Sequence, residues 1–328
     1  MLLAGDIGGT KTTLAAYGPN AAARAPLVET TYPSAEYPSL EALVQVFINQ
    51  TRLDFERASF GVAGPVVEGA STITNLPWKM SETQLSAALG IPSVRLLNDL
   101  EAAAYAIPSL GPADLRTLHA GRAAPEGPIA LIAPGTGLGE AFITRRGGRI
   151  EVHPSEGGHC DFAPTNALQV GLLEYLRQRE GHVSFERVCS GRGIPNVYAY
   201  LRDNGFAPEP EWLAALLAGT EDDTPAIVTA AMDRERPCAL CAATVEMFVA
   251  ILGAEAGNLA LKVLATGGVY LGGGIPPRIL SFLEAPRFLE AFQHKGRFAE
   301  LLARIPLHVI LNRKVALLGA AQYGLHRA

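Results

Sequence analysis

The stretch Gly5–Thr12 reads GDIGGTKT and follows the apolar residues Leu2–Ala4. It differs from a phosphate-binding P-loop in one position, because Thr10 stands where the second glycine of that motif should be. A P-loop also needs a helix directly after its lysine, whereas the residues after Lys11 are β-branched and favour a strand. The stretch therefore predicts a strand, a tight glycine-rich turn and a second strand.

Such a turn can bind an anion through its backbone N–H groups, since Gly8 and Gly9 tolerate close approach and positive φ. Asp6 stands at the end of the first predicted strand. A carboxylate at this place would repel a phosphate unless a Mg²⁺ ion lay between them. A purely structural hairpin with Asp6 as a capping residue explains the same residues, so both interpretations stay open.

A second turn of this kind lies in the middle of the chain. Gly135–Gly139 reads GTGLG and stands between the apolar runs Ile129–Ala133 and Ala141–Thr144. It misses the dinucleotide-binding motif GxGxxG, because Glu140 occupies the last glycine position and a strand rather than a helix follows. A third glycine run, Gly272–Gly274, follows another apolar run. The repetition predicts two related halves that each offer a hairpin turn to a shared cleft.

Bulk properties restrict the class of protein. The chain has 328 residues, of which 48% are hydrophobic and 18% charged, with a formal net charge of -5. This length favours two domains, and the composition is typical of a soluble globular protein. No basic block indicates a nucleic-acid surface, and no secretion signal is recognisable. Polar residues interrupt the most apolar segment, Val245–Ala265, which predicts a buried helix rather than a membrane span.

The four cysteines are Cys160, Cys189, Cys238 and Cys241. They form no disulfide framework and suit a reducing cytoplasm. Cys238 and Cys241 form a CxxC motif within an alanine-rich, helix-like stretch, without a second pair of ligands at zinc-finger spacing. Two buried free thiols are therefore favoured over a metal or redox site.

Periodicity and turn signals predict alternating strands and helices. We expect strands at 2–5, 12–17, 58–62, 94–97, 129–133, 141–144 and 269–271, and helices at 39–50, 81–89, 100–106, 168–179 and 315–323. Helical segments dominate from residue 168 to residue 264. The segment 108–128, rich in Gly, Pro and Ala, is the candidate domain boundary. The order of elements predicts an α/β protein with mixed sheets.

Asn98 and Asp99 follow one of the predicted strands and precede a predicted helix. Ligands of open α/β sheets gather at this position, outside the carboxyl ends of the strands. Asp99 could accept a proton from a hydroxyl nucleophile, as phosphoryl transfer requires. Both residue types also serve as helix N-caps, so the residues alone leave a capping role open.

The sequence SEGGH at 155–159 holds a carboxylate, an imidazole and two glycines within five residues. The glycines keep the loop tight, so that Glu156 and His159 can face one small ligand. Such groups make paired hydrogen bonds to vicinal hydroxyls. A plain surface turn explains the loop equally well. Further along, Glu186 either caps a helix or binds a ligand.

Together these motifs resemble the bacterial glucokinases, which belong to the actin-like, ribonuclease-H-like ATPase superfamily. The resemblance covers essentially the whole chain, and its order and spacing are specific although each motif alone is common. The matching segments are Asp6–Thr10, Leu97–Asp99, Gly135–Gly139, Ser155–His159, Phe185–Glu186 with Ser190–Gly191, and Leu271–Ile275.

The resemblance implies a two-domain actin-like fold, with a small α/β domain, a larger α+β domain and a cleft between them that binds glucose and ATP. The family's C-terminal helix returns to the small domain. We therefore expect the small domain at 1–109 and 315–328 and the large domain at 110–314. The resemblance further implies a cytoplasmic homodimer that phosphorylates D-glucose at its 6-hydroxyl in the first step of glycolysis, with ATP and Mg²⁺ and without zinc, and with no membrane or nucleic-acid partner.

The resemblance also implies residue roles. Asp99 is expected to be the general base, and the sugar ligands are expected to be Asn98, Asp99, Glu156, His159 and Glu186. The ATP phosphates are expected to lie at Asp6, Gly8, Gly9, Thr10, Lys11, Gly135, Thr136, Gly137 and Gly139. Gly272, Gly273 and Gly274 are expected to leave room for the adenosine. Asp6 is expected to orient Mg²⁺ through water.

Two residues depart from the family pattern. Lys11 stands where some relatives carry Asn, and it either adds a cation near the phosphates or faces solvent. Glu140 is an unusual charge to place beside ATP, and it either points away or acts through Mg²⁺. The zinc-binding cysteine cluster that often follows the histidine in related kinases and repressors is missing after His159, which favours the zinc-free group.

Three alternatives remain. A kinase for another hexose or for an N-acetyl amino sugar, such as N-acetylmannosamine, would use the same chemistry. A sugar-responsive regulator of the same fold would need an N-terminal helix-turn-helix segment. We expect none, because Met1 directly precedes the first predicted strand. An actin-like filament protein would not need the pair Glu156 and His159.

Overall fold

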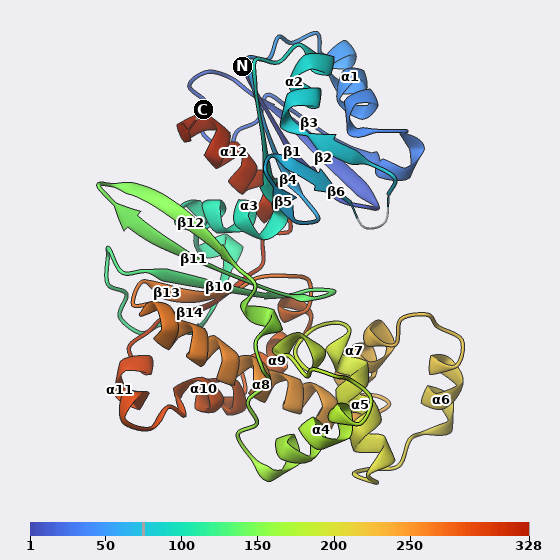
Figure 1. Cartoon of the computed structure of the whole chain (residues 1–328). Helices are drawn as coiled ribbons and strands as arrows, with labels where there is room; N and C mark the ends of the chain where they lie inside the picture. The colour runs from blue at the N-terminus through green and yellow to red at the C-terminus, as the bar shows by residue number, and fades with distance from the viewer. Residues whose placement is uncertain (74–75, 328) are drawn as a thin grey trace. The chain divides into compact units, whose positions relative to one another are not determined.

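The structure is a computed structural model that describes residues 1–73 and 76–327, and its chain forms two compact units (Figure 1). Unit 1 contains Met1–Asp114 and Asn312–Ala328, and unit 2 contains Leu115–Leu311. Each unit has its own sheets and helices and is described by itself.

Unit 1 is built on a five-stranded sheet with strand order β3-β2-β1-β4-β8. Strand β1 pairs antiparallel with β2 and parallel with β4, and β4 pairs parallel with β8. The chain between β4 and β8 forms a second, three-stranded sheet with strand order β5-β6-β7. The bounds are β1 Leu2–Ile7, β2 Lys11–Tyr17, β3 Val28–Pro33, β4 Arg57–Val62, β5 Val66–Val67, β6 Ala70–Thr72, β7 Lys79–Ser81 and β8 Ser93–Asn98.

The register of this sheet aligns three strand ends. Ile7 of β1 pairs with Val62 of β4, and Val62 pairs with Asn98 of β8. Because parallel strands all point the same way, the residues beside these ends share one edge of the sheet. Asp6 and Asp99 therefore meet at that edge.

The helices of unit 1 begin where the sequence predicts. The Ser39 hydroxyl accepts a hydrogen bond from the backbone N–H of Ala42 and caps α1, and Ser81 caps α2 in the same way. Helix α12 approaches α3 so closely that a side chain at Gly319 would overlap the carbonyl oxygen of Ala102. The bounds are α1 Leu40–Thr51, α2 Glu82–Leu89, α3 Asp99–Ala106 and α12 Val315–Arg327, with 3₁₀ turns at Ser34–Glu36, Ile107–Ser109 and Pro112–Asp114.

Unit 2 is built on a six-stranded sheet with order β12-β11-β10-β13-β14-β9. Strand β10 pairs antiparallel with β11 and parallel with β13, which repeats the arrangement of β1 with β2 and β4. The internal repeat of strand, glycine turn and strand is thus present in both sheets. The bounds are β9 Leu115–His119, β10 Ile129–Pro134, β11 Leu138–Arg146, β12 Arg149–Ser155, β13 Gly268–Leu271 and β14 Leu307–Ile310.

Helices make up the rest of unit 2, with α8 as their central member (Figure 1). The α-helices are α4 Ala167–Arg177, α5 Gly193–Asp203, α6 Glu211–Leu217, α7 Thr224–Met232, α8 Ala239–Val263, α9 Leu280–Leu283, α10 Pro286–Gln293 and α11 Ala299–Leu302. The 3₁₀ turns are Gly157–His159, Phe185–Arg187, Pro276–Arg278 and Gly296–Phe298.

Helix α8 is long and apolar enough, by length and composition, to cross a membrane, and it is the one such helix among the described residues. Most of it is buried inside the protein, however, and Phe248, Leu252 and Ala256 are fully enclosed. It begins after Cys238, its N-cap, within the alanine-rich stretch that the sequence indicates as helix-like. Cys238 and Cys241 are both buried free thiols, as predicted.

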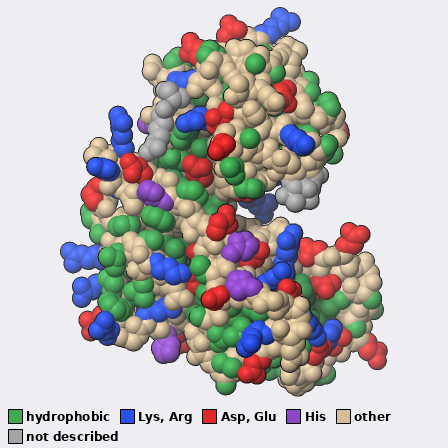
Figure 2. Space-filling model, in the orientation of Figure 1, with side chains coloured by type: hydrophobic (Ala, Val, Ile, Leu, Met, Phe, Trp, Pro, Cys, Tyr) green, Lys and Arg blue, Asp and Glu red, His purple; other side chains and the backbone are tan. Residues whose placement is uncertain are grey.

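The surface agrees with the modest net charge. On the face drawn in Figure 2, Lys and Arg side chains alternate with Asp and Glu side chains over both units. This mixture is typical of a soluble surface and differs from the clustered basic patch that nucleic-acid binding requires.

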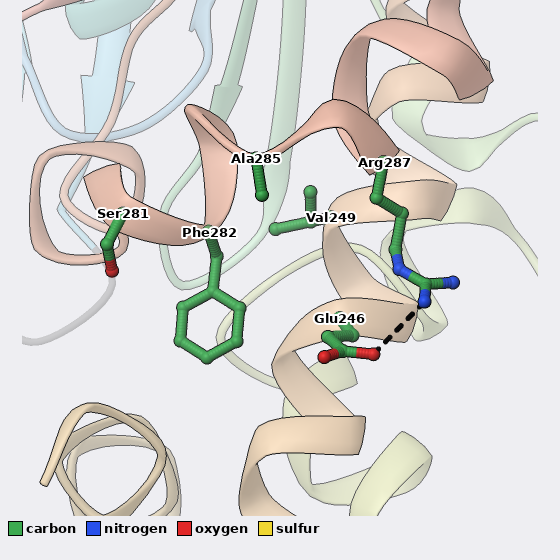
Figure 3. A pocket seen from close by; sticks show the side chains of 6 residues that line it. All are labelled: Glu246, Val249, Ser281, Phe282, Ala285 and Arg287. Atoms are coloured by element: carbon green, nitrogen blue, oxygen red, sulfur yellow. Dashed lines mark ion pairs between the residues drawn. The ribbon is translucent and has the colours of Figure 1, made fainter. Parts of the chain in front are cut away.

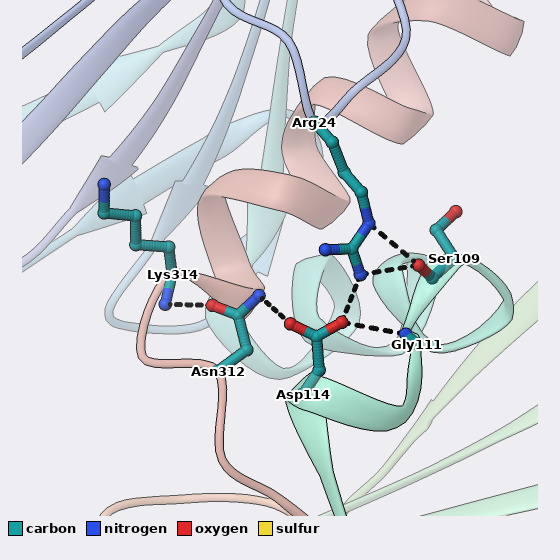
Figure 4. Close-up of polar contacts among 6 residues, drawn as sticks. All are labelled: Arg24, Ser109, Gly111, Asp114, Asn312 and Lys314. Atoms are coloured by element: carbon teal, nitrogen blue, oxygen red, sulfur yellow. Dashed lines mark hydrogen bonds and ion pairs between the residues drawn. The ribbon is translucent and has the colours of Figure 1, made fainter.

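A polar cluster in unit 1 surrounds the two points where the chain leaves this unit and returns to it (Figure 4). The carboxylate of Asp114 accepts hydrogen bonds from the Arg24 guanidinium, from the Gly111 backbone N–H at 2.8 Å and from the Asn312 amide at 2.9 Å. Arg24 also donates to the Ser109 carbonyl oxygen. Asp114 thus ties together three chain segments that are far apart in sequence.

Replacing this carboxylate should destabilise the protein. We expect Asp114→Ala to lower the free energy of unfolding by about 2 kcal/mol, because hydrogen bonds to a charged group are lost and partly buried donors are left without this acceptor. The Arg24 guanidinium holds the pKa of Asp114 below its usual value. The stabilisation is therefore complete above the usual aspartate pKa of about 3.9 and is lost as the pH falls towards the folded value.

Denaturant unfolding at pH 7 and at decreasing pH measures this effect. The matched control is Glu284→Ala, which removes an ion pair with Arg116 in which both side chains are accessible. This control should cost about 1 kcal/mol or less, as exposed pairs do. Equal losses in the two variants would contradict the central role of Asp114.

Candidate active site

The carboxyl edge of the unit 1 sheet carries Asn98 and Asp99 at the start of α3. The Asn98 side chain is the helix cap: its Oδ1 accepts from the Leu100 N–H at 2.9 Å, and its Nδ2 donates to the Gly64 carbonyl oxygen at 2.9 Å. The capping role that the sequence left open for both residues thus belongs to Asn98. Asp99 lies in the first turn of α3, and its side chain is exposed. Its Oδ1 also accepts a hydrogen bond from the Leu100 N–H, at 2.8 Å.

Asp6 and Asp99 are close enough to influence each other's charge. Burial, and then the charge of Asp99, raise the pKa of Asp6 to about 6, while Lys11 opposes this rise. Burial by surrounding protein atoms also raises the pKa of Asp99, although solvent reaches this side chain. Lys11 lies on β2 with an exposed side chain, and its positive charge lowers the pKa of Asp6. Lys11 is therefore one of the charged groups at this edge of the sheet. The arrangement offers two carboxyl groups and one cation to a ligand.

The first glycine turn joins β1 to β2, with the Gly8 N–H donating to the Lys11 carbonyl oxygen at 3.1 Å. Neither Gly8 nor Gly9 has a left-handed φ, so the turn does not use the positive φ that glycine tolerates. Space explains the first glycine instead, since a Cβ on Gly8 would lie 3.0 Å from that same carbonyl oxygen. Thr10 is exposed at the tip.

Ser34 supports this turn, and the sequence analysis missed it. Its side chain is fully buried, and its Oγ donates to the Gly8 carbonyl oxygen at 2.7 Å. Its backbone N–H donates to the Thr10 carbonyl oxygen at 3.0 Å. A serine after a strand carries no recognisable motif, so only the fold reveals that Ser34 holds the turn.

The second glycine turn joins β10 to β11 and is held by the segment that follows Glu186. The Gly191 N–H donates to the Gly135 carbonyl oxygen at 2.7 Å. The Oε2 atom of Glu186 accepts from the Leu138 N–H at 2.9 Å and occupies the space where a side chain on Gly137 would lie. Glu186, predicted as a sugar ligand, therefore also fixes the second turn. Thr136 is exposed at its tip, and Gly139 pairs with Ala133 in the ladder of β11 with β10.

The third glycine run packs against the second turn. Gly272 donates its N–H to the Ile132 carbonyl oxygen at 2.9 Å. Gly273 has a left-handed φ of 80° and no room for a side chain beside the Pro134 carbonyl oxygen. Gly274 faces open space. The structure thus brings the second and third glycine segments together within unit 2.

The loop at 155–159, called the sugar loop below, follows β12. The Gly157 N–H donates to Ser155 Oγ at 3.0 Å, and a 3₁₀ turn begins there. Gly158 lies against the Leu138 carbonyl oxygen with no space for a side chain. The Glu156 and His159 side chains are 88% and 60% exposed, with Oε2 and Nε2 4.0 Å apart. The buried glycines press the loop onto β11, and the two polar groups point outward together.

Glu140 lies between the second turn and the sugar loop, but it points into the core of unit 2 and is 1% exposed. This resolves the alternative that the sequence left open, because the side chain turns away from the glycine turn. Its surroundings are described below.

A surface pocket of about 270 Å³ lies between α8, α9 and α10 (Figure 3). Its two charged lining residues, Glu246 and Arg287, form an ion pair at 3.2 Å. None of the predicted site residues lines it, so it is not the candidate site. Among the described residues, no group of three or more His, Cys, Asp or Glu side chains is placed to hold a metal ion.

The paired sheets, each with a glycine turn between its first two strands, define the actin-like ATPase class that includes the sugar kinases. The chain matches the glucokinase family model over residues 3–327. It is 44% identical to the curated glucokinase of Nostoc sp. (strain PCC 7120), with 98% of each chain covered. The chain belongs to the glucokinase family of enzymes, and the predicted resemblance and fold class are confirmed.

Solved structures agree. The glucokinase from an Antarctic psychrotroph is 34% identical, with a TM-score of 0.85 and coverage of 100% of this chain and 99% of that one. A ROK family glucokinase from Streptomyces griseus, solved in complex with glucose and AMPPNP, is 20% identical with a TM-score of 0.62 and 98% of each chain covered. At this lower identity the likeness shows the shared fold.

The electrostatic coupling at the edge of unit 1 can be measured directly. We expect the carboxyl ¹³C signal of Asp6 to titrate with a pKa of about 6. Asp99→Asn should lower this pKa, because a like charge is removed, and Lys11→Met should raise it, because an opposite charge is removed. Titration of Asp6 near the ordinary aspartate value in all three proteins would show that the two carboxyl groups do not interact.

Proposed function

We propose that this protein is an ATP-dependent glucokinase that transfers the terminal phosphoryl group of ATP to the 6-hydroxyl of D-glucose, the first step of glycolysis. The observation that carries this proposal is the Asp99 carboxyl group, accessible at the carboxyl ends of the three parallel strands of unit 1 and held with a raised pKa. A general base works best when its pKa lies closer to the working pH. The glucokinase relatives support glucose as the acceptor.

In this proposal Asp99 accepts the proton of the 6-hydroxyl as that oxygen attacks the phosphorus. Glu156 and His159 of the sugar loop bind the other hydroxyls, together with Asn98 and Glu186. Each hydroxyl that is paired with a protein group contributes to specificity, because an analogue without it leaves that group unpaired. Bound glucose and AMPPNP in the S. griseus structure support this pair of ligands.

The two hairpin turns supply backbone N–H groups for the phosphates, namely Gly8–Thr10 in unit 1 and Gly135–Gly139 in unit 2. Gly272–Gly274 leaves room for the adenosine. We propose that the two units correspond to the small domain, 1–109 with 315–328, and the large domain, 110–314.

Asp6 fits a Mg²⁺ ion that is held mainly by the ATP phosphates. Magnesium usually keeps several waters and takes one or two carboxylates together with phosphates. Burial, and then the charge of Asp99, raise the pKa of Asp6, and a cation bound beside it would favour the ionised carboxylate. Asp6 would hold Mg²⁺ through water, and the ion would supply positive charge to the phosphates.

We further propose a cytoplasmic homodimer that uses no zinc. A coupled phosphorylation assay tests the function across glucose, mannose, fructose and their N-acetyl amines, with ATP, polyphosphate and ADP as donors. Glucose with ATP should give the highest kcat/KM. A preference for N-acetylmannosamine would replace glucose as the substrate, and no phosphorylation of any sugar would remove the kinase proposal.

Removing the base should stop turnover without preventing binding. We expect Asp99→Asn to lower kcat by about a thousandfold, within the range that a general base contributes, while glucose still binds in calorimetry. Asp54→Asn is the matched control, because Asp54 is an exposed aspartate of the same unit. Turnover near the wild-type value in Asp99→Asn would remove Asp99 as the base.

Weakening the sugar loop should act on glucose alone. We expect Glu156→Gln to weaken glucose binding about tenfold, because a hydrogen bond to a charged group is replaced by a neutral one. The affinity for ATP should stay the same, since this loop does not contact the phosphates in our proposal. Calorimetry with Glu126→Gln, an exposed glutamate of unit 2, provides the control. A change in ATP affinity without a change in glucose affinity would reassign the loop.

A further inference from the structure

Two buried carboxyl groups lie beneath the sugar loop in unit 2. Glu140 on β11 is 1% exposed and Glu255 on α8 is 0% exposed. In the sheet, Glu140 pairs with Ser155, the residue that begins the sugar loop. A carboxyl group is therefore enclosed between the strand that follows the second turn and the loop that carries Glu156 and His159.

Glu140 is in direct contact with the sugar loop. Its Oε2 atom occupies the space beside Gly157, so that a methyl group on Gly157 would overlap this oxygen. Gly157 adjoins Glu156, and the Cys160 N–H donates to the Gly157 carbonyl oxygen at 2.9 Å to close the turn around His159. A movement of the Glu140 carboxyl group would thus displace the backbone between the two predicted sugar ligands.

Glu255, by contrast, is held by other polar groups. Its Oε2 accepts from the Asn258 amide at 2.8 Å, and its Oε1 accepts from Lys262 Nζ at 3.3 Å. Lys295, which follows α10, donates to Asn258 Oδ1 at 2.6 Å and to the Ala254 carbonyl oxygen at 2.8 Å. These bonds fix Glu255 to α8 and give the buried pair a rigid base.

Glu140 Oε1 has no hydrogen-bond partner among the described residues when both carboxyl groups are ionised, because both are then acceptors only. Glu255 lies within hydrogen-bonding reach of Glu140, so a proton on one of them completes the bond. Burial, and then the charge of Glu255, raise the pKa of Glu140 to about 7, while Lys262 opposes the rise. The buried Cys189 thiol also faces the pair, and its own pKa is raised by burial and by both carboxylates, so it stays neutral.

We propose that Glu140 is a positioning residue for the sugar loop, which holds Gly157 in place through its hydrogen bond to Glu255 and so sets where Glu156 and His159 meet the sugar. The inference rests on the proposed function. Ionisation of Glu140 breaks the bond and creates repulsion between the two carboxylates, which shifts the carboxyl group against Gly157. If Glu140 served only the fold, its replacement would lower the stability of the protein or change the KM values for glucose and ATP to the same extent.

The first test uses the contact between Glu140 and Gly157. Gly157→Ala should raise the KM for glucose about tenfold or more, because its methyl group would overlap Glu140 Oε2 and displace the loop, with the KM for ATP unchanged. In the double variant with Glu140→Ala the methyl group occupies the vacated space. The glucose KM of the double variant should therefore fall below that of Gly157→Ala. If the fold-changes in the glucose KM of the two single variants simply multiply in the double variant, the inference is overturned.

The second test uses Glu140→Gln, which keeps the shape of the side chain and donates a hydrogen bond to Glu255 at every pH. The wild-type KM for glucose should rise as the pH passes through about 7, the pKa of Glu140. In Glu140→Gln the glucose KM should stay flat across this range, while kcat and the KM for ATP keep the wild-type pH profile. A wild-type pH dependence of the glucose KM in this variant would overturn the inference.

The matched control is Glu246→Gln, an exposed glutamate on the same helix as Glu255, which should leave every parameter unchanged. Circular dichroism and thermal unfolding of each variant identify any loss of fold. Wild-type protein that does not phosphorylate glucose would overturn the proposed function and this inference together. The inference alone is overturned if the wild-type protein is active but the changes in glucose KM of the two single variants multiply in the double variant. It is also overturned if Glu140→Gln keeps the wild-type pH dependence of the glucose KM.

Discussion

The parallel register of β1, β4 and β8 is the constraint on which the chemistry of unit 1 depends. It sets Ile7, Val62 and Asn98 level at one edge of the sheet, and so brings together two aspartates that are far apart in sequence. A slip of one residue in this register is costly, because it would break the hydrogen bonds between the strands and exchange their buried faces. Asp6 and Asp99 therefore stay close although their charges repel each other.

Close backbone approach has the same importance in unit 2. Gly137, Gly157 and Gly158 each lie where a side chain would overlap a neighbouring atom, and those neighbours belong to Glu186, Glu140 and Leu138. The second turn, the start of β11 and the sugar loop are consequently packed as one layer. Glycine is required at these positions for space rather than for a left-handed φ, since none of the three has one.

Much of the fold could be predicted from the sequence because the local signals agree with the final structure. Ser39 and Ser81 cap their helices, and both glycine turns join antiparallel strands. Helix α8 includes the alanine-rich stretch around Cys241 that the sequence indicates as helix-like, although Cys238 is an unusual N-cap.

The contacts that support the predicted site residues were not predictable from the sequence. Ser34 holds the first turn from a segment with no motif of its own. Glu186 belongs to no sequence motif that indicates a contact with the second turn. Its side chain nevertheless accepts a hydrogen bond from the Leu138 N–H beside that turn. Such contacts depend on tertiary packing, which brings together residues whose spacing in sequence carries no signal.

The two like-charge pairs differ in what can relieve them, and this difference separates their roles. Asp6 and Asp99 lie at an accessible edge beside Lys11, where a bound cation can neutralise them. Glu140 and Glu255 are enclosed, so only a proton or the nearby Lys262 can do so. A carboxyl group whose folded pKa is raised loses stability as the pH rises from its unfolded pKa of about 4 to its folded pKa, because ionisation is easier in the unfolded chain. This loss is complete above a pH of about 6 for Asp6 and about 7 for Glu140. A cation at the accessible edge would remove the loss for the first pair, whereas the enclosed pair has no such access and responds to pH.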